Sequence, residues 1–554
     1  MTKTKRIILA AVIGTVLTAL SYYLFLPPLN IFSTDFWGFL VAVICFWGLP
    51  LGAISNADKG KKENKKKTEQ KAITFKPRVS KVFLIVLAIP VAVLILGGVI
   101  SSTFFNAVAY SDVIREDIVT DDFAVDMPEA DVVSDISLMD TASAAIIGNR
   151  KLGELASVVS QYELSYDYNQ INYKNTPKKV ANLEYVDFFR WINNSDAGIP
   201  GYVMVDPVNS SADYVEFKTP MKYVDSAFFG EDLMRQLRFS YPTKIFSTVN
   251  FEVDDAGNPY YVVSCMKPHV ALFGAMDVSE VIIFNPCDGS SELVSVENTP
   301  AWVDNVYDGD LACEKYDWYG TLSDGYWNSV IGKRNCRVTT DGYGYIVRDD
   351  DVWYFTGVTS VTSDESNIGF IISNARTGAY KYYPVVGAEE YSAMGAAEGE
   401  VQEKGYVASF PSLINVKGQA TYIMVLKDAN GLVKLYALVN AENYTIVATG
   451  ESQKAAKEAY LAELVEKNVI TNEVPPTPEM ETKTADVTVK TVRLATVSGE
   501  TVVYITAEDG IVYRGALAAD ESLILIAEGD QITVTYAETD HFSIRAITAW
   551  KFTD

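Results

Sequence analysis

Three uninterrupted apolar stretches dominate the first hundred residues of the chain. They cover residues 7–26, 36–54 and 82–100 and contain no charged side chain. A helix needs about 20 apolar residues to cross the hydrocarbon core of a bilayer, and each stretch has that length. No small-residue cleavage motif follows the first stretch. We therefore expect residues 1–100 to form an anchor of three uncleaved transmembrane helices.

The charges that flank these stretches predict an orientation. Lysine and arginine near membrane segments stay on the cytoplasmic side. Loop 27–35 has no basic residue, whereas the loop 55–81 is strongly basic. We expect a cytoplasmic N-terminus, an extracytoplasmic segment 101–554, and contact between the basic loop and anionic lipids of the inner leaflet. The basic residues of this loop are Lys59, Lys61, Lys62, Lys65, Lys66, Lys67, Lys71, Lys76, Arg78 and Lys81.

After residue 100 the pattern changes several times. Residues 101–140 hold ten acidic residues and one arginine, and charge repulsion within them predicts an extended acidic stalk. Residues 141–470 mix amphipathic helices with short strands that end at glycine or asparagine turns. Residues 471–483 form a proline-rich linker. Residues 484–554 contain short alternating strands, one of them over residues 523–527, which are typical of a small OB-like or SH3-like β-barrel.

A hairpin pattern recurs three times between residues 141 and 470. In each copy an aromatic strand precedes an apolar strand that ends at asparagine and a polar turn. The copies pair residues 260–263 with 281–289, residues 352–355 with 369–378, and residues 421–425 with 435–440. Repeats of this kind predict antiparallel sheets that each pack against a helix. The expected fold class is therefore membrane-anchored α+β, with a C-terminal small β-barrel.

The charge balance narrows the choice of partners. The whole chain carries a net charge of −25, and because residues 1–100 carry +9, the remaining 454 residues carry −34. A surface this acidic repels nucleic acids and anionic lipids. It is compatible with a soluble extracytoplasmic domain or with cationic ligands.

Four cysteines lie in the segment that we expect outside the membrane, where disulfide bonds persist. We treat Cys265, Cys287, Cys313 and Cys336 as candidate disulfide partners. Two bridges among them have three connectivities, and their spacing does not choose one. Four buried free thiols are the alternative. Cys45 lies within the second apolar stretch and is expected to behave as a small apolar residue.

Searches for catalytic and metal-binding patterns find none. The two histidines, His269 and His541, fall in different predicted domains, so no nucleophile, base and orienting acid come together. There is no phosphate-binding glycine loop, no clustered cysteine pair and no acidic loop with the calcium-binding spacing. We therefore expect no catalytic, cofactor or metal residues. Paired carboxylates of the glycosidase kind stay open, because 71 acidic residues allow many pairs.

Three segments carry a resemblance to a known family. GNRKLGELASVVSQYELS (148–165), TGVTSVTSDESNIGF (356–370) and KDANGLVKLYALVNAENYTIVATG (427–450) resemble a family of uncharacterised bacterial membrane-anchored extracytoplasmic proteins. The resemblance covers roughly residues 140–450. It implies a bacterial cell envelope and supplies no catalytic residues. The hairpins are also similar in pattern to small extracytoplasmic modules of the PepSY type.

These observations support one leading hypothesis and two alternatives. The leading hypothesis is a non-enzymatic, membrane-tethered extracytoplasmic scaffold or binding protein within a cell-envelope complex. The first alternative is an envelope enzyme, a carboxylate-based hydrolase of wall polymers. The second is an extracytoplasmic sensor that acts through a membrane partner. Facing carboxylates in a deep aromatic cleft would favour the enzyme, and a shallow surface would favour the binding protein.

Overall fold

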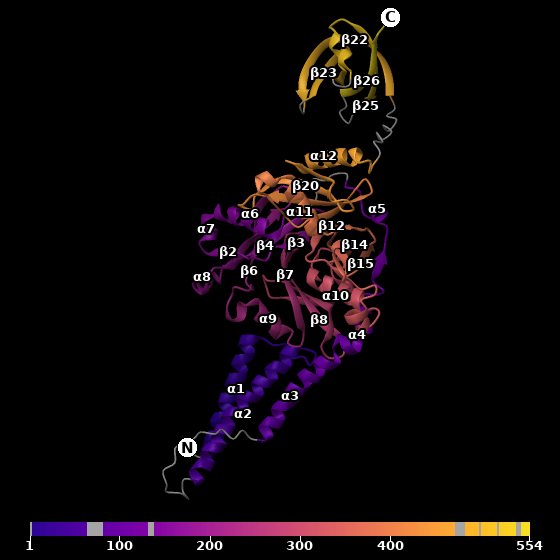
Figure 1. The fold of residues 1–554 in the computed structure, drawn as a ribbon. Coiled ribbons are helices and arrows are strands. Elements are labelled where there is room, and N and C mark those ends of the chain that lie inside the picture. Colours follow the sequence, from indigo (N-terminus) through magenta and orange to yellow (C-terminus); the bar gives the residue numbers. More distant parts are fainter. Residues whose placement is uncertain are drawn as a thin grey trace. The chain divides into compact units, whose positions relative to one another are not determined.

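A computed structural model describes residues 3–63, 81–130, 138–470, 482–497, 500–517, 520–538 and 544–553. The chain divides into two compact units, Met1–Lys467 and Asn468–Asp554. Figure 1 traces the helices and strands in chain order. Helices and antiparallel sheets follow one another along the chain, which confirms the predicted mixed α+β class.

The N-terminal anchor contains the helices α1 (Lys3–Phe25), α2 (Thr34–Glu63) and α3 (Lys81–Ile100). Among the described residues, the helical segments long and apolar enough to cross a membrane are Ile7–Phe25 and Lys81–Ile100. The apolar described part of α2, Thr34–Gly48, is shorter. Helix α2 continues to Glu63, so the predicted loop 55–81 begins as helix. Residues 64–80, which hold most of the basic residues, lie outside the described part of the chain.

The far end of α1 is joined to the body of the first unit by hydrogen bonds. Arg238, on helix α9 (Leu233–Ser240), donates from Nε to the Leu26 carbonyl at 2.8 Å. The Leu29 amide donates to the Pro242 carbonyl at 2.7 Å. The first bond satisfies a carbonyl at the C-terminal end of α1, where helical carbonyls lack intrahelical partners. One side-chain and one backbone hydrogen bond therefore hold the segment after α1 against the rest of the first unit.

The predicted acidic stalk is wrong for the residues that the structure describes. We call residues 101–130 the strap; it contains α4 (Thr103–Ser111), β1 (Ile118–Thr120) and α5 (Phe123–Asp126). Strand β1 pairs in parallel with β15 (Tyr380–Tyr383). Ile114, Phe123 and Met127 are buried in the body. Burial of these side chains and the pairing of strap carboxylates with cations of the body outweigh the charge repulsion on which the stalk prediction rested.

Four sheets follow one another in the first unit, and their strands pair antiparallel apart from β1 with β15. The first holds β2 (Tyr162–Leu164), β3 (Asn169–Asn172), β4 (Pro177–Tyr185), β5 (Ile199–Asp206) and β6 (Ser211–Met221). The second holds β7 (Ile245–Val253), β8 (Pro259–Val270), β9 (Gly274–Phe284) and β10 (Ser291–Ser295). The third holds β1, β11 (Arg337–Thr339), β12 (Gly344–Arg348), β13 (Asp351–Ser360), β14 (Ser363–Asn374), β15 and β16 (Gly387–Ala388). The fourth holds β17 (Val407–Ala408), β18 (Ser412–Val416), β19 (Gln419–Lys427), β20 (Val433–Asn440) and β21 (Val447–Gly450).

The three predicted hairpins are confirmed as the central pairs of the second, third and fourth sheets. Tyr261 lies opposite Phe284 in the first of them. Phe355 lies opposite Ile372 in the next, and Tyr422 lies opposite Val439 in the last. The turns after β9 and β14 use Gly289 and Gly378 at φ of +79° and +74°, a conformation that glycine adopts without strain.

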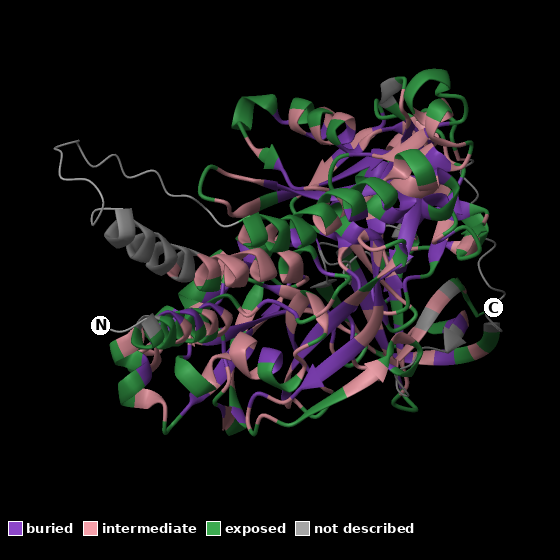
Figure 2. Cartoon of the chain, turned by 90° about the horizontal axis from the view of Figure 1, so that it is seen from below, coloured by how far each residue is buried: buried purple, intermediate pink, exposed green. Residues whose placement is uncertain are grey.

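Neighbouring sheets contact one another through particular strands. Strand β3 contacts β7 and β13, and β12 contacts β18. Buried residues in Figure 2 follow the strands, and the anchor helices carry mostly exposed and half-buried residues. The core therefore lies between sheet faces, where aromatic and β-branched side chains pack.

Helices cover the faces and connections of the sheets. They are α6 (Thr141–Gly153), α7 (Ala156–Val159), α8 (Phe188–Asn194), α9, α10 (Gly309–Leu322), α11 (Glu390–Glu400) and α12 (Gln453–Glu466). Asp140 caps α6 by accepting a hydrogen bond from the Ser143 amide at 2.7 Å. Helices α11 and α12 confirm that helices occur among the strands of residues 141–470.

The second unit is a closed barrel with the strand order β22-β23-β24-β26-β25. Its strands are β22 (Thr482–Val497), β23 (Glu500–Ala507), β24 (Val512–Ala516), β25 (Gln531–Glu538) and β26 (Ile544–Phe552). The predicted strand at residues 523–527 is instead a short 3₁₀ helix, Glu521–Leu525. Asp520 caps this helix by accepting a hydrogen bond from the Ser522 amide, which favours a helical start over an extended one. Residues 471–481 of the predicted linker lie outside the described residues.

Candidate functional site: an acidic hollow beside the strap

The strap turns sharply where β1 ends. The Asp121 amide donates to the Tyr382 carbonyl at 3.1 Å, which completes the pairing of β1 with β15. The Asp122 carboxylate then accepts a hydrogen bond from the Ala124 amide at 2.9 Å and caps α5. The ring of Phe123 packs edge-on against Tyr383, with ring centroids 5.5 Å apart. A cap followed by a buried aromatic side chain thus sets the position of the turn.

One carboxylate, that of Asp126, holds the strap to the third sheet. Arg348 donates to it from both terminal nitrogens, at 2.7 and 3.1 Å. Lys381 Nζ and the Tyr383 hydroxyl donate to it at 2.6 Å each. The hydrogen bonds from Arg348 hold the pKa of Asp126 well below its usual range. We call this group of four residues the latch.

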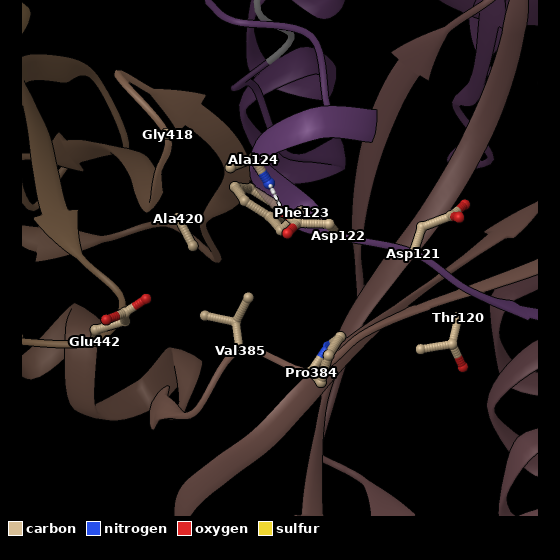
Figure 3. A pocket seen from close by; sticks show the side chains of 10 residues that line it. All are labelled: Thr120, Asp121, Asp122, Phe123, Ala124, Pro384, Val385, Gly418, Ala420 and Glu442. Carbon is tan, nitrogen blue, oxygen red and sulfur yellow. Dashed lines mark hydrogen bonds between the residues drawn. The ribbon is translucent and has the colours of Figure 1, made fainter.

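Next to the latch lies a hollow of about 440 Å³, shown in Figure 3. Its walls come from the strap, from the residues after β15, from the start of β19 and from Glu442, which follows β20. In Figure 3 Glu442 lies on one side of the hollow and the strap residues lie on the other. The lining residues are Thr120, Asp121, Asp122, Phe123, Ala124, Pro384, Val385, Gly418, Ala420 and Glu442.

The lining combines carboxylates with apolar groups and contains no lysine, arginine or histidine. Asp121 is partly engaged, because its carboxylate lies 3.4 Å from Lys381 Nζ. Glu442 is exposed. Carboxylates accept hydrogen bonds from ammonium and guanidinium groups, and the aliphatic groups at Val385 and Ala420 fit the methylene stem of such a cation. The hollow is therefore suited to binding a positively charged group.

The four candidate disulfide cysteines lie on different elements. Cys265 is on β8, Cys287 follows β9, Cys313 is on α10 and Cys336 precedes β11. All are free thiols, so the predicted bridges are absent from the described residues. The Cys287 thiol lies 3.1 Å from the Thr219 carbonyl and the Cys336 thiol lies 3.6 Å from the Thr321 carbonyl. Each thiol thus packs against its own neighbours rather than against another thiol.

Burial also makes these thiols poor nucleophiles. It raises the pKa of Cys265 and of Cys313 to about 12, and the pKa of Cys287 to about 11. The thiolate is the reactive form of cysteine, so its population at neutral pH is small at these positions.

Of the basic residues expected to face the inner leaflet, Lys59, Lys61 and Lys62 belong to the helical backbone of α2, and Lys81 begins α3. The others, Lys65, Lys66, Lys67, Lys71, Lys76 and Arg78, lie outside the described residues. His541 also lies outside them. His269 is on β8, with Nε2 3.8 Å from the Asp277 carboxylate.

The structure brings together a buried acidic pair that the sequence did not single out. Glu252, on β7, accepts hydrogen bonds from the backbone amides of Asp304 and Asn305 at 2.9 and 2.8 Å. Asp304 in turn accepts one from the Asn172 amide at 2.7 Å. Burial raises the pKa of both carboxyl groups. This pair links β3 of the first sheet to β7 of the second and lies beneath the surface rather than in the hollow.

A buried lysine forms a second unexpected feature. Lys179, on β4, is almost fully buried, and its Nζ lies 5.0 Å from the centre of the Tyr345 ring. Burial lowers the pKa of Lys179 to about 8.

Within the described residues, no group of three or more histidine, cysteine, aspartate or glutamate side chains is arranged to hold a metal ion.

Comparisons with known proteins supply no family. No family model matches the chain, and no curated protein matches it. Among solved structures, an endo-arabinase from Bacteroides thetaiotaomicron is similar over 50% of this chain and 74% of its own, with 11% sequence identity and a TM-score of 0.16. A similarity at that TM-score carries no conclusion about the fold or function of this chain.

Proposed function

We propose that the chain is a non-enzymatic, membrane-anchored extracytoplasmic binding protein of a bacterial cell envelope. Three spans, residues 7–26, 36–54 and 82–100, place the N-terminus in the cytoplasm and residues 101–554 outside. The apolar helices α1 and α3 and the excess of basic residues around the anchor support this topology. The barrel, with β24 and β26 parallel and a short helix before β25, serves as an OB-type contact module.

One observation supports the binding role above all, namely the carboxylate lining of the hollow beside the strap. Its ligand is the cationic group of a partner, such as a lysine or arginine side chain of an envelope protein. Its only aromatic lining residue, Phe123, is buried, so the hollow offers no exposed ring for stacking on a sugar. This favours a binding protein over a hydrolase of wall polymers.

Full-length protein in lipid nanodiscs tests the binding role with an acetylated trilysine amide as the probe and a triglutamate peptide as its control. Glu442→Gln removes one charge from the hollow and is expected to weaken trilysine binding about fivefold, the loss of roughly 1 kcal/mol of charge interaction. Glu528→Gln, at an exposed carboxylate of the barrel, is the matched control and should bind as the wild type does. Equal affinities for the two variants would refute the proposed site.

Protease protection tests the topology. Trypsin added to sealed inverted membrane vesicles should cut the basic loop between residues 59 and 81, and trypsin added to right-side-out vesicles should leave it intact. Cleavage of the loop from the outer side would overturn the orientation. Affinity isolation after mild crosslinking tests the scaffold role, because recovery of the protein alone would count against it.

A further inference from the structure

An exposed apolar surface lies where the strap leaves α3. We call it the interfacial patch, and its exposed residues are Phe104, Phe105, Val108, Trp327, Val330 and Ile331. Trp327 is 64% exposed and Ile331 is 72% exposed, values that are high for large apolar side chains. The ring of Phe104 lies 5.0 Å from that of Tyr326 and 5.9 Å from that of Trp327. The two segments of the patch are thus in contact.

The sequence of α4 explains why one side of the patch points away from the body. Ala107 and Tyr110 face the body and are buried, and the Tyr110 ring packs edge-on against Trp318 of α10 at 5.1 Å. Phe104 and Val108 are 47% and 52% exposed, on either side of a kink at Asn106 (φ −129°, ψ 24°). Segment α4 therefore carries apolar side chains on both sides. Ala107 and Tyr110 are buried against the body, whereas Phe105 and Val108 are exposed beside Phe104, which contacts the rings of Tyr326 and Trp327.

The patch is continuous with the anchor. Helix α3 ends at Ile100, and α4 begins at Thr103. The hydroxyl of Ser101 accepts hydrogen bonds from the amides of Leu272 and Phe273 at 3.1 and 3.0 Å, which fixes the end of α3 against the turn between β8 and β9. The exposed face of α4 therefore begins within one helical turn of the last apolar residue of a membrane-spanning segment.

Charge distinguishes the rim of this patch from the rest of the acidic body. Lys333 and Arg334 follow Ile331 after a single glycine, and both are exposed. Neither makes an ion pair with another described residue. Aromatic residues favour the level of the lipid headgroups, and lysine and arginine next to them reach the phosphates. An apolar patch with a basic rim beside a membrane span matches the chemistry of a phospholipid surface.

We propose that the interfacial patch lies in the headgroup region of the outer leaflet. Trp327 and Ile331 are inserted at the carbonyl end of the acyl chains, and Lys333 and Arg334 lie against lipid phosphates. This inference rests on the proposed membrane anchoring of the chain. The ligand of the patch is the bilayer itself. A second anchoring surface of this kind restrains the tilt of the body relative to the membrane more tightly than the three helices would alone.

Quenching of tryptophan fluorescence by lipids brominated near the carbonyl end of the acyl chain tests the inference. Full-length wild-type protein is reconstituted in phosphatidylcholine–phosphatidylglycerol vesicles beside three variants, Trp327→Phe, Trp47→Phe and Trp302→Phe. The difference between the wild type and each variant isolates the emission of one tryptophan. Trp47 lies in the anchor, and Trp302, packed on Tyr260 in the second sheet, is the matched control away from the patch.

We expect loss of the Trp327 and Trp47 emissions in brominated vesicles and no loss of the Trp302 emission. Quenching of Trp47 without quenching of Trp327 would overturn the inference and leave the anchoring intact. Absence of quenching at both positions would overturn the anchoring and the inference together. Lys333→Gln with Arg334→Gln should reduce the quenching of Trp327 in vesicles with phosphatidylglycerol, and an unchanged signal would refute the phosphate contact.

Discussion

The latch at Asp126 allows a quantitative test of how the strap is held. Asp126→Ala removes a carboxylate that accepts four hydrogen bonds, two of them from Arg348 and the others from Lys381 and Tyr383. The side chains of Arg348 and Lys381 are only 11% and 23% exposed, and after the mutation each keeps one carboxylate partner, Asp349 for Arg348 and Asp121 for Lys381. Breaking a buried ion pair costs about 3 to 5 kcal/mol, and partial exposure favours the lower end, about 3 kcal/mol.

Hydrogen exchange of strap peptides measures this loss locally, in full-length protein and without global unfolding. If the strap opens as a unit, about 3 kcal/mol corresponds to roughly 150-fold faster exchange of the amides around β1 and α5. Asp126→Asn keeps the shape of the side chain and should give a smaller acceleration. Asp112→Ala is the matched control, because its partner Arg115 is 45% exposed and surface pairs contribute about 0.5 kcal/mol or less.

Similar exchange rates in Asp126→Ala and Asp112→Ala would refute the role of the latch. The pH dependence gives a second check. Because the pKa of Asp126 is lowered in the folded state, its contribution is fully present above the ordinary aspartate pKa, about 4, and is lost only as the pH falls further. Protection of the strap, corrected for intrinsic exchange, should therefore be constant between neutral pH and about pH 5.

Two other features give predictions of their own. Burial raises the pKa of Glu252 and Asp304, so their contribution to stability is complete below about pH 4 and declines as the pH rises towards neutrality. Glu252→Gln should flatten this decline, measured as the difference in melting temperature between pH 5 and pH 7.5, and an unchanged difference would contradict the assignment. Cys265 and Cys313, with pKa values of about 12, should resist alkylation at pH 7.5 in native protein and react after denaturation, as mass spectrometry can follow. Rapid native labelling of either thiol would contradict its burial.

Local patterns in the sequence were sufficient to predict the hairpins. The apolar runs of β8 and β9 and the glycine at position 289 lie close together in the chain, so strand, turn and partner could be read from one short stretch. The barrel strands were predictable for the same reason. The short helix at Glu521–Leu525 was missed because a run of apolar residues does not distinguish a short strand from a helical turn.

The folding of the strap and the position of the hollow could not be predicted from the sequence, because both depend on contacts between residues far apart in the chain. Asp126 finds Arg348 at a separation of 222 positions and Lys381 at 255 positions, and no local pattern shows such partners. The acidic composition of residues 101–140 instead suggested repulsion. The position of Glu252 between Phe251 and Val253 in an apolar strand was a weak indication that its carboxyl group is buried. Because side chains alternate between the two faces of a strand, the same position was equally compatible with an exposed carboxylate.

The folding of the strap onto the third sheet sets the reach of the protein. Thirty residues in extended form would span about 100 Å and would let the body sample a broad shell of the envelope. Bound along the body, the same residues form a short connection, and in the proposed membrane-anchored protein they would keep the body close to the bilayer surface. A partner of the proposed kind would then be bound only near the membrane. The latch is one of the contacts that hold the strap, together with the pairing of β1 with β15, so a ligand that competed for Asp126 would weaken the short connection and lengthen the reach of the body.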